Sequence, residues 1–144
     1  MREPASHPVP LRLQLTPNWA ITLNEQFLKD ETGKSLRLFN ERLQIWIRSY
    51  LTPDGPAILD RMETDAARAP ANAADVVKGV TKGIGQVSYV VPASRLDDGK
   101  TKAPSLFTYS HGSQSQIMIV FDHKGPSSLK AAQDIFASLE YIDA

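Results

Sequence analysis

The sequence of 144 residues contains no cysteine and three histidines. The lack of cysteine excludes a disulfide framework, a thiolate metal site and a cysteine nucleophile together. Long apolar runs are also lacking, since none approaches the roughly 18 residues that a membrane-spanning helix needs. These absences predict a protein without disulfides, without cysteine chemistry and without a transmembrane helix.

An excess of charge of either sign is absent as well. Sixteen basic residues balance sixteen acidic ones, so we expect no long-range attraction toward nucleic acid or an anionic membrane. Hydrophobic residues make up 42% and charged residues 22% of the chain, which is typical of a soluble globular protein. A chain of this length buries roughly 68–70% of its unfolded surface, which is enough for a self-sufficient core.

Residues 1–10, MREPASHPVP, contain three prolines and no hydrophobic segment of the kind found in secretory signals. We therefore predict a flexible N-terminal lead over residues 1–10, followed by a single domain over residues 11–144. The missing signal and the missing cysteines predict a cytoplasmic location.

The densest apolar pattern lies in residues 36–51, which predict two strands joined at Asn40 and Glu41. Residues 43–51 alternate with a period of two, as expected of a half-buried strand. One face of this strand is apolar and is predicted to be core: Leu43, Ile45 and Ile47. The opposite face is polar and aromatic: Gln44, Trp46, Arg48 and Tyr50. That second face is either packed under another layer or free to bind a partner.

The same alternation predicts five further strands: residues 11–15, 19–23, 86–91, 106–110 and 116–121. Two charged, glycine-containing stretches are predicted to be connections without regular structure: residues 29–34 and 95–103. Because strands arrive in runs instead of alternating one by one with helices, the sheet should be mainly antiparallel.

Helical spacing of apolar residues predicts a helix between Pro56 and Pro70, with a buried stripe of Ile58, Leu59, Met62, Ala66 and Ala69. A short helix is predicted over residues 73–80, and a last helix with Ser127 as its N-cap. The expected class is therefore α+β, with a mainly antiparallel sheet flanked by two or three helices.

The histidines do not follow the pattern of a metal site. His7 lies in the lead, and His111 and His123 lie at opposite ends of the last predicted hairpin. A zinc site needs about three protein ligands that converge. We therefore predict surface histidines and no metal ligand.

Other stretches resemble catalytic motifs without matching them. Ser110 and His111 are adjacent, but no serine lies in a G-x-S-x-G elbow. The glycines of residues 79–85 lack the spacing of a phosphate-binding loop. The carboxylates of the first helix are predicted to face solvent: Asp60, Glu63 and Asp65. The sequence thus predicts no catalytic residue, no cofactor and no enzymatic activity.

The polar face of residues 43–51 is the candidate interaction surface, because tryptophan, tyrosine and arginine often anchor protein interfaces. It consists of Gln44, Trp46, Arg48 and Tyr50. A competing prediction is a pocket between the sheet and a helix, for a small ligand or an enzyme substrate. Its polar groups would come from Arg48, Tyr50, Tyr89, Tyr109 and His111.

The order of the sequence segments resembles that of Mog1/PsbP-like domains: WAITL at 19–23, LQIWIRSY at 43–50, ILDRMETDAA at 58–67, SYVV at 88–91, LFTYS at 106–110, QIMIVF at 116–121 and a closing amphipathic helix. This resemblance spans residues 11–142. It implies an α/β/α sandwich around an antiparallel sheet, used as a non-enzymatic binding module, and it transfers no functional residue. The chain is also similar to small uncharacterised proteobacterial proteins.

Together these features predict a bacterial protein-binding module without catalysis, monomeric or homodimeric, whose partner is another protein and neither nucleic acid nor membrane. The resemblance implies an adaptor or chaperone beside secretion-system effectors, with type VI secretion as one setting, and an immunity-type protein would also fit the predicted protein binding. The competing function is a small-ligand binding protein or an enzyme.

Overall fold

The computed structural model describes residues 7–32, 35–51, 57–81, 83–95, 99–124 and 126–142. Within these ranges the first five strands are β1 (Leu11–Thr16), β2 (Trp19–Leu23), β3 (Leu28–Thr32), β4 (Ser35–Phe39) and β5 (Leu43–Leu51). The later strands are β6 (Ala74–Thr81), β7 (Ile84–Val91), β8 (Ser94–Arg95), β9 (Thr101–Lys102), β10 (Ser105–His111), β11 (Ser115–His123) and β12 (Glu140–Tyr141). The helices are α1 (Ile58–Ala67) and α2 (Pro126–Ala137).

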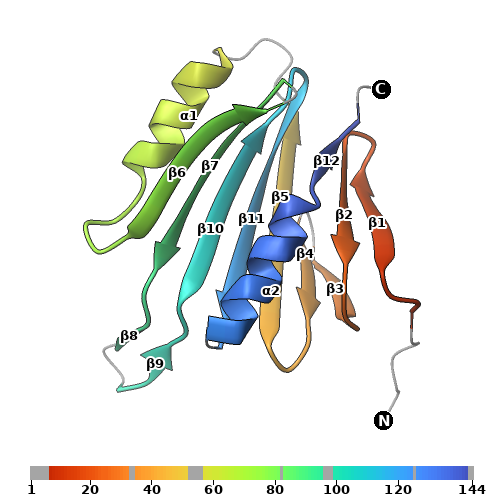
Figure 1. Ribbon diagram of the computed structural model, residues 1–144, viewed down its shortest axis with the longest axis vertical. Helices are drawn as coiled ribbons and strands as arrows, with labels where there is room; N and C mark the ends of the chain where they lie inside the picture. Colours follow the sequence, from red (N-terminus) through yellow and green to blue (C-terminus); the bar gives the residue numbers. More distant parts are fainter. Residues whose placement is uncertain are drawn as a thin grey trace.

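Ten of the strands in the described residues form two antiparallel sheets (Figure 1). The larger sheet has seven strands in the order β3-β4-β5-β11-β10-β7-β6, and the smaller sheet has the order β1-β2-β12. Strands β8 and β9 pair as a separate ribbon. Strand β5 therefore lies inside the larger sheet, between β4 and β11.

The main hydrophobic core lies on one face of the larger sheet, called the inner face. This face holds Ile45, Ile119 and Phe121, which are fully buried. Trp19 of β2 and Ile135 of α2 belong to the same cluster, because the smaller sheet and α2 cover the inner face. Figure 1 shows α2 lying across the larger sheet beside β2. Burying each such side chain contributes roughly 1.5–3 kcal/mol to stability.

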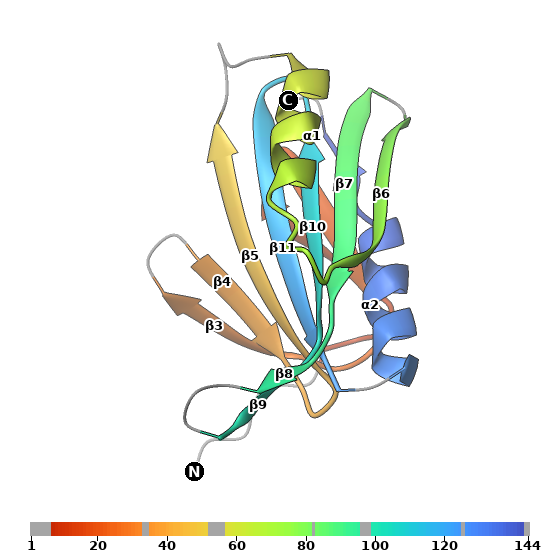
Figure 2. The same ribbon diagram turned by 90° about the vertical axis from the view of Figure 1, so that its left-hand side faces the viewer.

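The opposite face, called the outer face, is covered by α1 over part of its width (Figure 2). Met62 of α1 belongs to a second, smaller cluster with three residues of β7 and β10: Val87, Tyr89 and Tyr109. Gly85 of β7 permits this close approach, because a Cβ atom there would lie 2.5 Å from the Met62 Sδ.

Beyond α1 the outer face is open to solvent. The helix has 10 residues and packs on β6, β7 and β10. On β5, Trp46 is 41% exposed and Tyr50 is 43% exposed. The question that the sequence left open is thus answered, because no described element packs over the polar side chains of β5.

The expected α+β class is wrong. The described residues form a β-rich fold of two antiparallel sheets with two helices, and not an antiparallel sheet flanked by two or three helices. The predicted helix over residues 73–80 is strand β6, which suits its β-branched valines. Part of the predicted connection over residues 29–34 belongs to strand β3. The predicted Mog1/PsbP-like α/β/α sandwich is therefore wrong as well, because a three-stranded sheet covers much of the inner face of the larger sheet, beside α2.

Other predictions are confirmed. The antiparallel pairing, the hairpin of β4 and β5, and the hairpin of β10 and β11 are present. The last predicted helix is α2, but Ser127 is not its N-cap, because the helix begins at Pro126. Residues 1–6 of the predicted lead, Gly33 and Lys34, Pro56 and residues 96–98 lie outside the described ranges. Neither described helix has the length and apolar character needed to cross a membrane.

Candidate functional site

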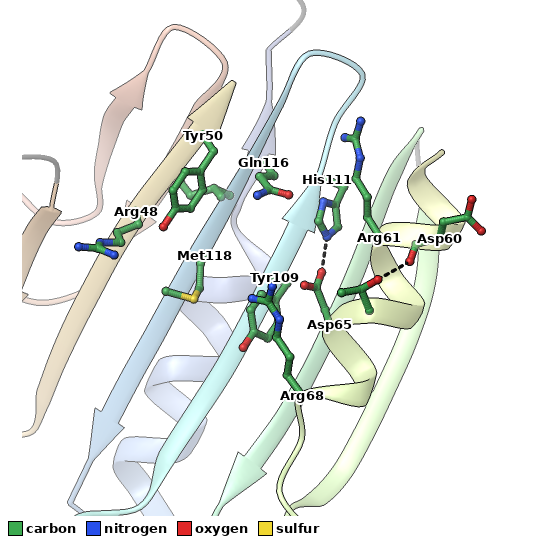
Figure 3. A pocket seen from close by; sticks show the side chains of 12 residues that line it. Arg48, Tyr50, Asp60, Arg61, Asp65, Arg68, Tyr109, His111, Gln116 and Met118 are labelled. Carbon is green, nitrogen blue, oxygen red and sulfur yellow. Dashed lines mark hydrogen bonds and ion pairs between the residues drawn. The ribbon is translucent and has the colours of Figure 1, made fainter. Parts of the chain in front are cut away.

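A pocket of about 580 Å³ lies where α1 stops covering the outer face (Figure 3). Its floor and one wall come from strands β5, β10 and β11, and its other wall is α1. The step between a short helix and a wider sheet produces this hollow. A second pocket, beside α2, is smaller at about 280 Å³.

The register of the strands sets two rows of side chains across the pocket floor. The first row consists of Tyr50, Gln116 and His111. The second row consists of Arg48, Met118 and Tyr109. Neighbouring strands lie about 4.8 Å apart, so each row spans roughly 10 Å from β5 to β10. Strand pairing alone therefore brings together side chains from three separate parts of the chain.

The helix wall of the pocket is polar. It consists of Asp60, Arg61, Thr64, Asp65 and Arg68. Positions 61, 65 and 68 are spaced by four and three residues, so they lie on one side of the helix. Met62 and Asp65 are the buried residues of α1. One helix thus packs on β7 through Met62 and presents charged groups to the pocket.

A buried contact between a histidine and a carboxylate lies at the junction of α1 and β10. The Nε2 of His111 contacts the Oδ2 of Asp65, 46 residues away in the sequence. His111 is 3% exposed and Asp65 is 6% exposed. The Nδ1 of His111 has no hydrogen-bond partner in the described part of the chain. The contact therefore occupies one oxygen of the Asp65 carboxylate and joins the helix to the sheet.

Tyr109 of the second row makes a polar contact with Tyr89 of β7. The hydroxyl groups of Tyr89 and Tyr109 lie 3.1 Å apart. The Tyr89 ring also stacks on Phe107, with centroids 5.3 Å apart. Burial, followed by the hydrogen bond with Tyr109, raises the pKa of Tyr89 above its ordinary value. Tyr89 consequently keeps its proton to a higher pH than an exposed tyrosine does.

The arginines of the pocket differ in what they contact. The Nε of Arg48 donates to the Ser35 Oγ at 3.0 Å, so this side chain leans toward β4. The guanidinium of Arg68 makes no ion pair with any residue that the structure describes. Figure 3 shows Arg68 extending from α1 toward Tyr109, and shows the Asp60 carboxylate turned away from Met118. The pocket beside Tyr109 therefore has a cationic wall.

The hydroxyl groups near His111 are directed elsewhere. Ser110 faces the inner side of the sheet, where its Oγ accepts a hydrogen bond of 3.1 Å from the Gln86 Nε2. The Thr64 Oγ1 donates to the Asp60 carbonyl at 3.1 Å.

Within the described ranges, no group of three or more histidine, aspartate or glutamate residues is placed to hold a metal ion.

The predicted interaction surface is divided by the structure. Gln44, Trp46, Arg48 and Tyr50 lie on one face of β5, as the alternation predicted. Arg48 and Tyr50 line the pocket, whereas Trp46 lies farther along β5. The Trp46 Nε1 donates to the Asp122 Oδ2 at 3.2 Å, and the Arg37 guanidinium lies 5.5 Å from its ring centroid.

The competing set of pocket residues is largely brought together. Arg48, Tyr50, Tyr109 and His111 line the pocket. Tyr89 is outside the pocket lining; it is buried on β7 in the cluster with Met62 of α1, and its hydroxyl contacts that of Tyr109.

Sequence reasoning missed the α1 wall. Asp65 was predicted to face solvent but is buried, and Leu59 was predicted to be buried but is 64% exposed. The prediction of surface histidines is also wrong for His111 and His123, which are 3% and 4% exposed. One signal was available, since Asp65 follows Met62 by three residues and therefore belongs to the buried stripe.

Comparisons with known proteins identify a solved structure with a similar fold. No family model matches the chain, and no curated protein matches it. A solved structure from Bacteroides thetaiotaomicron VPI-5482 is similar, with a TM-score of 0.62 and 13% sequence identity. The alignment covers 87% of this chain but 45% of that one, so this chain spans less than half of the longer protein. Similarity at this level shows the fold alone.

Proposed function

We propose that this protein binds a small molecule in the pocket between α1 and the outer face of the larger sheet. The observation that carries the proposal is a hollow of about 580 Å³ with a charged wall and an aromatic floor. Ligand pockets commonly measure about 300–1,000 Å³ and combine apolar surface with a few placed polar groups. The pocket therefore has both the size and the mixed lining of a binding site.

The surroundings of the pocket support binding without conversion of the ligand. His111 is the residue best suited to acid–base chemistry, but it is 3% exposed, and its Nδ1, the nitrogen that Asp65 leaves free, is buried as well. The nearby hydroxyls of Thr64 and Tyr109 are bonded to other protein groups. A general base must lie within hydrogen-bond reach of the proton that it takes. The proposal is accordingly a binding protein and not an enzyme.

A thermal-shift screen against a metabolite library tests this proposal. A ligand at 100 times its dissociation constant stabilises the folded state by about 2.7 kcal/mol, which raises the melting temperature measurably. The blocking variant is Met118→Trp, which places a large ring on the pocket floor. The matched control is Val120→Trp, on the same strand and the same face but outside the pocket lining.

We expect one chemical class to stabilise the wild type and Val120→Trp, and to lose its effect on Met118→Trp. Stabilisation that survives in Met118→Trp would place the ligand elsewhere. A library that shifts none of the three proteins would refute a small-molecule function.

A second function, protein binding through Gln44, Trp46, Arg48 and Tyr50, is favoured by the exposure of two aromatic side chains on β5. Trp46 and Tyr50 are 41% and 43% exposed, and such residues are common anchors of interfaces. A protein partner would then contact β5 beside the pocket.

The test is recovery of a partner by wild type, Trp46→Ala and Val77→Ala from the native organism. Val77 is 58% exposed on β6, far from β5 in the sheet order. We expect wild type and Val77→Ala to retain a partner that Trp46→Ala loses. Equal recovery by all three proteins would exclude this surface.

A further inference from the structure

The chemistry of the pocket narrows the class of ligand, because its charged groups lie mainly on one wall. Arg68 stands on α1 and has no ion-pair partner in the described part of the chain. The Asp65 carboxylate is held by His111. The Asp60 carboxylate points away from the floor in Figure 3. The α1 wall therefore favours an anionic group over a cationic one.

The floor and the opposite wall have a different character, because Arg48, the charged residue of that wall, leans toward Ser35 of β4. Met118 and Tyr109 lie side by side in the same row of the sheet, and Tyr50 stands on β5 with its ring 43% exposed. Aromatic side chains prefer stacked or edge-on ring partners, and methionine sulfur packs favourably against aromatic rings. A span of roughly 10 Å between β5 and β10 accommodates one planar ring system. This part of the pocket favours an aromatic body.

Resting on the proposed binding function, we infer that the ligand is an aromatic carboxylate. Its carboxylate pairs with the Arg68 guanidinium, and its ring lies over Met118 beside Tyr50. A guanidinium suits this role because it presents two parallel N–H donors to the two carboxylate oxygens. The acid and the ring must be joined by a short linker, since Arg68 is on the helix wall and Tyr50 is on the opposite strand.

An NMR titration of the full chain with three probes tests the inference: 3-phenylpropionate, 3-phenylpropanamide and propionate. The amide removes the charge, and propionate removes the ring. We expect the amide and propionate each to bind at least about tenfold more weakly than 3-phenylpropionate, because each loses one of the two contacts. The backbone amide signals of Gln116 and Met118 should shift with 3-phenylpropionate.

Arg68→Gln is the diagnostic variant and Arg12→Gln is its control. Arg12 is an exposed arginine on β1 that pairs with Glu140 at 2.7 Å, away from the pocket. Arg68→Gln should bring the affinities for 3-phenylpropionate and its amide to within about threefold, whereas Arg12→Gln should keep the wild-type difference.

Equal binding of acid and amide by the wild type would overturn the carboxylate. If propionate bound as tightly as 3-phenylpropionate, the inferred ring contact would be wrong. If 3-phenylpropionate did not bind, both the inferred ring contact and the inferred carboxylate contact would be wrong. If a different library compound still stabilises the wild type but not Met118→Trp, the ligand class is wrong and the binding function stands. If no compound does so, the binding function fails with it.

Discussion

The buried contact between Asp65 and His111 provides the sharpest test of the structure. The two residues are 6% and 3% exposed, and they join α1 to β10. Replacing Asp65 by alanine leaves the His111 ring enclosed with neither nitrogen bonded to a described residue. Removing one partner of a buried pair costs about 3–5 kcal/mol. Since 1 kcal/mol shifts the melting temperature of a chain of this size by roughly 2–4 °C, we expect a drop of about 6–20 °C.

The assays are thermal unfolding, for the melting temperature, and urea unfolding, for the free energy, each followed by circular dichroism and tryptophan fluorescence with Trp19 as a fully buried reporter. Asp60→Ala is the matched control, because Asp60 is an exposed carboxylate on the same helix. An exposed charge near a helix N-terminus contributes less than about 1 kcal/mol.

A double-mutant cycle with Asp65→Ala and His111→Ala separates the pair from its surroundings. We expect a coupling of about 0.5–3 kcal/mol, because residues in direct contact are not additive. If Asp65→Ala unfolds within about 0.5 kcal/mol of wild type, or if the two single costs simply add, the buried pair is not formed in solution.

The remaining predictions concern the two faces of the larger sheet. Trp19→Ala should cost about 3–5 kcal/mol, because the ring is fully buried. Trp46→Ala should cost about 1 kcal/mol, because its ring is 41% exposed and contacts Arg37 by a cation–π interaction. Denaturation curves of both variants check this, and similar costs would mean that Trp46 is core. Because burial raises the pKa of Tyr89 in the folded state, the folded protein keeps the proton that the unfolded chain loses near pH 10. The stabilising effect of Tyr89 is complete below about pH 10 and declines as the pH rises toward its folded pKa. Denaturation between about pH 9 and 12 should show a steeper loss of stability for wild type than for Tyr89→Phe, and equal slopes would contradict the shift.

Much of the local structure could be predicted because it follows from periodicity. Alternation along residues 43–51 separated Ile45 and Ile47 from Trp46 and Arg48, and the structure places the two sets on opposite faces. The stripe of the last helix likewise predicted the burial of Ile135. Side chains two apart on a strand share a face whatever the rest of the chain does.

The failures arose where local preference and tertiary context compete. Residues 73–80 have alanine and valine spacing that fits a helix, but pairing with β7 makes them an edge strand with Val77 58% exposed. Residues 29–34 were expected to be a solvated connection, yet Asp30 and Arg37 pair across β3 and β4 with 3.4 Å between their charged atoms. In both segments, hydrogen bonds to a neighbouring strand stabilise a β conformation that the local sequence pattern does not predict.

The sequence by itself determined which side chains of β5 point together and that the sheet is antiparallel. Only the tertiary structure decided that α1 covers the outer face over β7 and β10 and leaves β5 open, because that depends on which distant strands supply the cluster around Met62. It also decided that Asp65 meets His111 across 46 residues. Periodicity sets which face of its own helix or strand a side chain occupies. A pocket depends on which distant elements pack against each other and where that packing ends.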